Sequence, residues 1–206
     1  MIVDRAAAGA RDLFTLADAA IQGGADVIQL RDKQSAPDLL LPLARQLRTL
    51  TQQRGIPLII NDHAGVAAQA GADGVHLGQD DASIAEARRI LGAGRLVGKS
   101  THSLEQAVAA EREGADYIGC GPVFVTPTKP DYGSVGLELV RRVTERVRVP
   151  VVCIGGIDVE RAGAVAAAGG RCVGVVRAVC AAPDPKSACR ELKQRLRQTP
   201  RAGQPA

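Results

Sequence analysis

The 206-residue sequence contains no tryptophan and has two phenylalanines and two tyrosines. Because single-stranded nucleic acids are held largely by stacking of bases on aromatic side chains, this composition disfavours them as partners. The net charge of +4 does not alter that expectation, since residues 184–206 carry six basic and two acidic side chains and account for the whole excess. We therefore expect no nucleic-acid partner.

The sequence also lacks a stretch of roughly 20 apolar residues, the length that a membrane span needs. Its start, "MIVDRAAAGARD", has no signal-peptide profile. The five cysteines are an odd number with no C-x-x-C pair, which argues against a disulfide framework or a zinc site. We expect a cytoplasmic protein without a membrane partner, with Cys120, Cys153 and Cys172 as buried thiols.

Four segments share one pattern, in which a glycine follows a helix-like stretch and precedes a short apolar run. Glycine is favoured just past a helix end, and short runs rich in Val and Ile are typical of buried parallel strands. The shared glycines are spaced by 47, 43 and 55 residues, which leaves room for two strand–helix units per repeat. The segments are "GGADVIQL" (23–30), "AGADGVHL" (70–77), "EGADYIGC" (113–120) and "AGGRCVGV" (168–175).

The segments between the repeats supply further strands and helices. Eight strands alternating with eight helices predict a compact, single-domain (β/α)8 TIM barrel. A doubly wound open sheet is the alternative, and the fourfold repeat favours closure. The further strands are expected at 2–4, 57–62, 95–100 and 150–156, and the helices at 11–22, 38–53, 64–70, 83–91, 103–113, 138–147, 158–168 and 185–197.

The ends of the domain are less regular. The first strand begins almost at Met1, so it is expected to be unusually short, or truncated because the true start lies upstream. We expect the barrel to span residues 1–197 and the segment 198–206 to be a disordered tail.

Polar residues stand where the predicted strands end, and active sites of this fold lie at those carboxyl ends. Each residue also has a structural explanation: Arg31 and Asp32 could form a surface ion pair, and His76 could be a core histidine. Donors or carboxylates at the ends of six strands favour a binding site instead. In chain order they are Gln29, Arg31, Lys33, Asn61, Asp62, His76, Asp81, Lys99, Ser100, Thr126, Thr128, Lys129 and Arg177.

These side chains suggest phosphorylated ligands. Asp62 and Asp81, at neighbouring strand ends, could complete an octahedral Mg²⁺ site with waters and phosphate oxygens. Many cationic donors around a metal indicate a diphosphate. Gly155, Gly156 and the pair 176–177 lie where the loops after strands seven and eight commonly bind a phosphate, which indicates a second, monophosphorylated substrate. No Ser–His–Asp arrangement or covalent nucleophile stands out.

Several motifs occur in order and at fitting intervals, and the chain resembles the thiamine phosphate synthase family over about residues 2–190. The resemblance implies that a pyrimidine diphosphate condenses with a thiazole phosphate, plain or carboxylated, to give thiamine phosphate and pyrophosphate. It also implies that Mg²⁺ bridges the diphosphate and that the carbon–oxygen bond breaks early, leaving a pyrimidine cation. The motifs are "QLRDK", "INDH", "DGVHLGQDD", "GKSTHS", "ADYIGCGPVFVTPTK" and "IGGI".

The resemblance also implies a role for each matching residue. It places the metal on Asp62 and Asp81. It assigns the pyrimidine diphosphate to Gln29, Leu30, Arg31, Asp32, Lys33, Asn61, His76, Ser100 and Lys129, of which Arg31, Lys33, Ser100 and Lys129 would act in catalysis. It assigns the thiazole phosphate to Thr126, Pro127, Thr128, Gly156, Val176 and Arg177. Arg177 departs from the family pattern, since many relatives carry serine there.

Two other functions stay open at this point. A thiazole tautomerase of the same barrel family would use a histidine, and His102 fits that subgroup, although it needs neither the carboxylate pair nor a T-x-T-K loop. A non-catalytic sensor would bind phosphorylated thiamine precursors without releasing pyrophosphate. The partners implied are small phosphorylated molecules, with a homo-oligomer possible.

Overall fold

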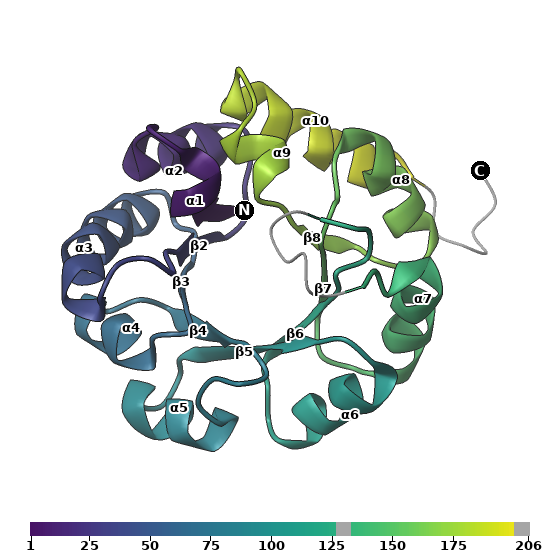
Figure 1. Cartoon of the computed structure of the whole chain (residues 1–206), viewed down its shortest axis with the longest axis horizontal. Helices are drawn as coiled ribbons and strands as arrows, with labels where there is room; N and C mark the ends of the chain where they lie inside the picture. Colours follow the sequence, from purple (N-terminus) through teal and green to yellow (C-terminus); the bar gives the residue numbers. More distant parts are fainter. Residues whose placement is uncertain (127–132, 200–206) are drawn as a thin grey trace.

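The computed structural model describes residues 1–126 and 133–199. Their strands form one parallel sheet in which each strand pairs with the next along the chain. A backbone hydrogen bond of 2.9 Å from Ile2 to Val175 joins the first strand to the end of the last. This closes the ring seen in Figure 1, so the (β/α)8 barrel is confirmed and the open sheet is wrong. The strands are β1 (Ile2–Asp4), β2 (Ile28–Arg31), β3 (Leu58–Asn61), β4 (Gly74–Leu77), β5 (Leu96–Thr101), β6 (Tyr117–Cys120), β7 (Val151–Ile154) and β8 (Cys172–Gly174).

The helices surround this sheet on its outer side (Figure 1). Eight of them match the predicted helices to within two residues at each end. The structure adds two four-residue helices, α1 (Arg5–Ala8) and α9 (Arg177–Cys180), which were not predicted. The others are α2 (Leu13–Gln22), α3 (Pro37–Gln53), α4 (Ala64–Ala70), α5 (Ile84–Leu91), α6 (Leu104–Arg112), α7 (Gly136–Arg146), α8 (Val159–Ala167) and α10 (Pro185–Gln198).

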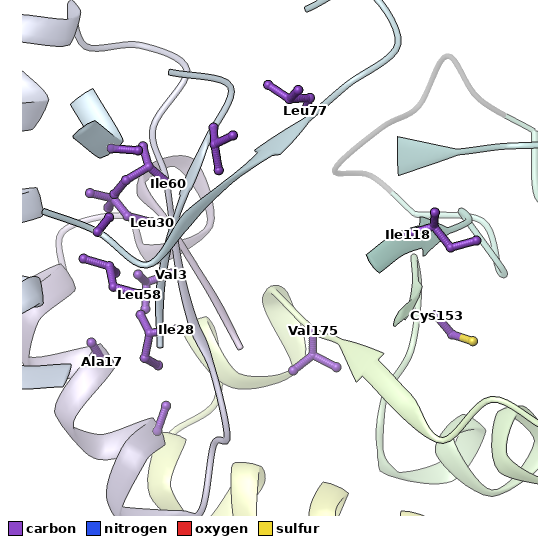
Figure 2. Packing of buried hydrophobic residues seen from close by; sticks show 14 of the residues in the cluster. Val3, Ala17, Ile28, Leu30, Leu58, Ile60, Leu77, Ile118, Cys153 and Val175 are labelled. Carbon is purple, nitrogen blue, oxygen red and sulfur yellow. The ribbon is translucent and has the colours of Figure 1, made fainter. Parts of the chain in front are cut away.

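The main core lies between the strands and the helices. Ile28 and Leu30 of β2 are fully buried, and Figure 2 shows Ile28 beside Ala17 of α2. Since side chains alternate along a strand, Gln29 and Arg31 then face the inside of the barrel. The outward half of each strand holds the fold together, and the inward half is free to carry polar groups.

The shared glycines behave as the repeat predicts. Gly24, Gly71, Gly114 and Gly169 all have positive φ, between 66° and 98°, just after a helix and ahead of β2, β4, β6 and β8. The structure therefore repeats in units of two strands and two helices.

The first strand has three residues, as short as expected. It is secured by the amino group of Met1, which donates to the carbonyl of Val27 over 2.9 Å. The predicted tail falls at the other end, where residues 200–206 lie outside the described residues. No helix within the described ranges has the length and apolar character needed to cross a membrane.

The cysteine prediction is partly wrong. Cys120 and Cys153 are buried, and burial raises the pKa of their thiols to about 11 and about 12. Cys172 is exposed, because it is the first residue of β8 and lies at the amino end of the barrel. Cys172 lies beside an apolar run in the sequence, but a residue at the start of a strand can still be exposed to solvent.

Candidate active site

A pair of carboxylates lies at the ends of β3 and β4. Asp62 adopts a left-handed backbone conformation (φ 64°), uncommon for a residue with a side chain. Its carboxylate forms an ion pair of 3.1 Å with Lys33. The side chain of Asp81 accepts a hydrogen bond of 2.6 Å from the backbone N–H of Gly78. The structure thus brings together the two residues predicted to hold a metal, with a lysine beside them.

The two carboxylates have opposite pKa shifts. Burial raises the pKa of Asp62, and the hydrogen bond and repulsion from Asp81 add to that effect. Burial would also raise the pKa of Asp81, but its hydrogen bonds with Asp62 and the N–H of Gly78 lower it below its ordinary value. Two adjacent carboxylates repel each other when both are ionised, so a cation between them would stabilise the pair.

This pair of carboxylates fits a magnesium ion whose other ligands come from water and from substrate phosphates. Among residues 1–126 and 133–199 there is no group of three or more His, Cys, Asp or Glu side chains placed to hold a metal. Two protein carboxylates are nevertheless what Mg²⁺ commonly takes when waters and substrate phosphates complete its octahedron. Asp62 and Asp81 would hold the ion.

Arg31 and Asp32 are not paired with each other. The guanidinium of Arg31 donates to the carboxylate of Asp4, a buried residue at the end of β1. Asp32 is buried and accepts from the backbone N–H groups of Gln34 and Ser35 and from the hydroxyl of Ser35. Asp4 was missed from the sequence because it reads there as an ordinary strand residue. It holds the guanidinium that is expected to meet a phosphate.

The remaining residues predicted for the pyrimidine diphosphate differ in exposure. Leu30 is fully buried in the core, so its side chain is directed away from the rim and its backbone alone could reach a ligand. Asn61 is buried at the end of β3, and Gln29 is half-buried inside the barrel. Lys129 lies outside the described residues.

His76 and Ser100 meet inside the barrel. The imidazole Nε2 lies 2.9 Å from the Ser100 hydroxyl oxygen. The backbone carbonyl of Ser100 accepts a hydrogen bond from the side-chain amide of Gln79. On the same side of the rim, Lys99 donates to the carbonyl of Gly78 over 2.7 Å. The carbonyl of Gly78 and its N–H are thus both engaged, which fixes the turn that carries Asp81.

The predicted phosphate turn follows β7. Gly155 and Gly156 have φ values of 100° and 63°, and a Cβ on Gly156 would lie 2.8 Å from Cβ of Phe124. Other residue types would be strained there and would not fit. The carbonyl of Gly156 accepts a hydrogen bond of 2.8 Å from Arg161, which orients this peptide unit.

The other residues predicted for the thiazole phosphate are described in part. Val176 precedes α9, and Arg177 is the first residue of that helix. This is where many TIM barrels bind a phosphate, next to a short extra helix after strand eight. Thr126 is buried. Pro127 and Thr128 lie outside the described residues.

His102, the candidate histidine of the tautomerase alternative, is held by the backbone. Its imidazole Nδ1 lies within hydrogen-bond distance of the carbonyl of Gly121. Its backbone N–H donates to the side-chain oxygen of Gln106 over 2.7 Å.

A cavity lies at each end of the barrel in the part of the chain that the structure describes. One of about 280 Å³ is bounded by Asp62 and His63 together with the first turns of α3 and α4. The other, of about 420 Å³, lies by Pro57 and Leu96 at the amino ends of β3 and β5. The smaller cavity contains Asp62, one of the two paired carboxylates, so cavity size does not identify the site here.

The fold and these side chains define a class of protein. A closed (β/α)8 barrel with paired carboxylates, cationic donors and a glycine turn at the carboxyl ends of its strands is a barrel enzyme suited to phosphorylated substrates. Comparison with known proteins supplies the family. The model of the family described as "Thiamine monophosphate synthase" matches residues 1–179.

Individual relatives agree with the family match. Thiamine-phosphate synthase of Roseiflexus castenholzii is 46% identical over 193 residues, covering 93% of this chain and 85% of the relative. That of Methanocella arvoryzae is 47% identical over 184 residues, covering 89% of this chain and 87% of the relative. The structure of thiamine phosphate pyrophosphorylase from Pyrococcus furiosus superposes with a TM-score of 0.89 at 34% identity, covering 96% and 95%. The chain belongs to the thiamine monophosphate synthase family, whose members are transferases.

Proposed function

We propose that the chain condenses 4-amino-5-hydroxymethyl-2-methylpyrimidine diphosphate with a thiazole ethyl phosphate, carboxylated or plain, to give thiamine phosphate and pyrophosphate, with loss of CO2 where the thiazole is carboxylated. The names of the related proteins, thiamine-phosphate synthase and thiamine phosphate pyrophosphorylase, support this reaction. The bond between the pyrimidine methylene carbon and the diphosphate oxygen breaks, and its electron pair leaves with pyrophosphate. The thiazole nitrogen supplies the electron pair of the new carbon–nitrogen bond.

The observation that carries the proposal is the pair Asp62 and Asp81 beside Lys33. In a dissociative reaction the barrier is charge separation, so the enzyme must stabilise the departing pyrophosphate. Magnesium bound to the two carboxylates would supply positive charge to the leaving oxygens. Lys33 lies next to this position, and Arg31, held by Asp4, would add a second cation.

The thiazole phosphate would be held on the other side of the barrel. The turn at Gly155 and Gly156, with the backbone at Val176 and Arg177, is the proposed cradle. A phosphate fixed there would hold the ring nitrogen in line with the pyrimidine carbon, which replaces an encounter in solution by a positioned reaction. Little general-base catalysis is needed, because no proton leaves the attacking nitrogen.

The first test is pyrophosphate release on mixing both substrates, with Mg²⁺ and again with EDTA. We expect release that requires both substrates and the metal, and Lys129→Ala to lower turnover by roughly two orders of magnitude or more, as for loss of one preorganised donor. Lys186→Ala is the matched control, since that lysine lies on α10 and contacts Gln22.

Other outcomes of that assay would count against the proposal. Near wild-type turnover in Lys129→Ala would remove that residue's role. No release from folded protein, combined with isomerisation of the thiazole precursor, would identify a tautomerase. Tight binding of both precursors without either reaction would identify a sensor.

The proposal extends to partners and compartment. Small phosphorylated molecules are the proposed ligands, with no nucleic-acid or membrane partner, and the cytoplasm is the proposed location. All five cysteines are free, which fits a reducing compartment. A homo-oligomer stays a prediction that light scattering on the purified protein would test.

A further inference from the structure

Tyr117 was not among the predicted site residues, yet its ring lies inside the barrel next to His76. His76, Gly98 and Tyr117 stand at the same level of β4, β5 and β6, since Gly98 is the register partner of both. A Cβ on Gly98 would lie 2.1 Å from Cζ of Tyr117. The absence of a side chain on β5 therefore lets the tyrosine reach across that strand to the histidine.

The contact between the two rings is specific. Their centroids are 5.5 Å apart with an interplanar angle of 28°, and the tyrosine hydroxyl lies 3.2 Å from Nδ1 of His76. On the far side of the imidazole, Nε2 lies 2.9 Å from the hydroxyl of Ser100. A Cβ on Gly119 would approach Cε1 of His76 to 3.2 Å, so a second glycine makes room for the imidazole. Three side chains thus form one hydrogen-bonded series, which begins with Tyr117 inside the barrel and ends with Ser100 at the rim.

The environment of Tyr117 gives this series a direction. Burial raises the pKa of Tyr117 above its ordinary value, so its hydroxyl keeps its proton. Within the described residues, that hydroxyl has Nδ1 of His76 as a hydrogen-bond partner, at 3.2 Å. A buried hydroxyl donates to an available acceptor. Nδ1 then accepts, Nε2 carries the imidazole proton, and that proton is donated to the oxygen of Ser100.

We propose that Tyr117 is a positioning residue for the reaction: it holds His76 in the tautomer protonated on Nε2, and so fixes Ser100 as a hydrogen-bond donor to the departing pyrophosphate. With one lone pair of Ser100 occupied by His76, the serine's own hydrogen is directed away from the imidazole and toward the rim. The role of Ser100 rests on the proposed function. The order of the protons rests on the hydrogen-bond geometry and on the burial of Tyr117, and not on the proposed reaction.

Nitrogen NMR of the histidine side chains tests the proton order without any substrate. The sequence has three histidines, so the imidazole signals can be assigned by single substitutions. We expect the Nε2–H tautomer for His76 in the wild type and its partial or complete loss in Tyr117→Phe, which keeps the ring but removes the hydroxyl. The Nδ1–H tautomer in the wild type, or a tautomer that Tyr117→Phe leaves unchanged, would overturn the proposal.

Kinetics test the link to Ser100. We expect Tyr117→Phe to lower kcat about tenfold, the effect of losing one hydrogen bond, with KM for the pyrimidine diphosphate within about twofold of wild type. In a Ser100→Ala background the same change should have almost no further effect, because the hydroxyl that Tyr117 and His76 would position is then missing. Equal losses in both backgrounds would show a merely structural role and refute the proposal. Thr49→Val, which removes an exposed hydroxyl on α3 bonded to Arg45, is the control.

The two measurements separate this inference from the proposed function. If the wild type releases no pyrophosphate, the proposed reaction fails and the catalytic role of Tyr117 fails with it. The NMR result would still decide whether the tyrosine orders the protons of His76 and Ser100. Pyrophosphate release by the wild type together with the Nδ1–H tautomer would refute the role of Tyr117 alone.

Discussion

At the scale of single residues, Gly98 has no room for a side chain. A methyl group there would overlap the Tyr117 ring, which is enclosed in the barrel and cannot move without displacing its neighbours. We expect Gly98→Ala to lower the free energy of unfolding by about 1–3 kcal/mol, the usual cost of overpacking. Urea unfolding measures this change.

Gly65→Ala is the control for that experiment. Gly65 lies in α4, and a Cβ there would meet no atom within 4 Å. Because alanine is the better helix former, this variant should be as stable as the wild type or more stable. Equal stability of Gly98→Ala and Gly65→Ala would mean that the Tyr117 ring is not fixed in its place.

The residues of the rim could be predicted because strand alternation and the rule for strand ends act locally. Asp62 and Asp81 are 19 positions apart and still meet, since both follow strands that are neighbours in the sheet. Tyr117 and Asp4 could not be predicted in the same way. The partner of Tyr117 is His76, 41 residues away, and the tyrosine reaches it through the space left by the missing side chain of Gly98. That space exists only when β4, β5 and β6 lie side by side, so the sequence of one strand does not reveal it.

At the scale of elements, α2 begins with a well-defined cap. The carboxylate of Asp12 accepts 2.8 Å hydrogen bonds from both the backbone N–H and the hydroxyl of Thr15. These bonds hold the pKa of Asp12 below its ordinary value of 3.8. We expect Asp12→Ala to lower the free energy of unfolding by about 1 kcal/mol at neutral pH, as for other lost caps.

The pH dependence of that loss has a definite sign. A carboxylate whose pKa is lower in the folded state stabilises the protein above its unfolded pKa, and this contribution fades as the pH falls through the folded value. The difference between wild type and Asp12→Ala should therefore be full at pH 7 and shrink below about pH 4. A difference that is the same at pH 7 and pH 3 would contradict this account. Glu145→Ala, at an exposed position in α7, is the control.

The long helices were predictable and the short ones were not. Helices such as α3 and α5 show the 3.6-residue spacing of apolar positions, and Ser83 caps α5 as a serine before such a run should. The four residues of α1 and of α9 make a single turn, which is too short for any periodicity. Asp4 caps the first of these helices, and the second begins three residues after the last residue of β8. Both follow strand ends at the rim, so the elements missed belong to the region of the site.

At the scale of the whole molecule, ligands that bind the folded barrel should stabilise it. Magnesium and pyrophosphate together, at about 100 times their Kd, should add roughly 2.7 kcal/mol to the free energy of unfolding. For a domain of this size that corresponds to a rise in Tm of about 5–10 °C, measurable by thermal denaturation. Asp81→Ala should lose the part of the rise that depends on magnesium. An equal rise in EDTA would mean that pyrophosphate binds without the carboxylates.

The position of Tyr117 also determines how the molecule absorbs and emits light. Without tryptophan, near-ultraviolet emission comes from two tyrosines, Tyr117 and Tyr132. In a Tyr132→Phe variant all of it would arise from one phenol stacked on His76 in the barrel interior. In this variant Tyr117 is an intrinsic fluorophore, and its hydrogen bond is the one proposed to set the tautomer of His76. Ligand binding near Ser100 can therefore be followed by tyrosine fluorescence, without attaching a dye.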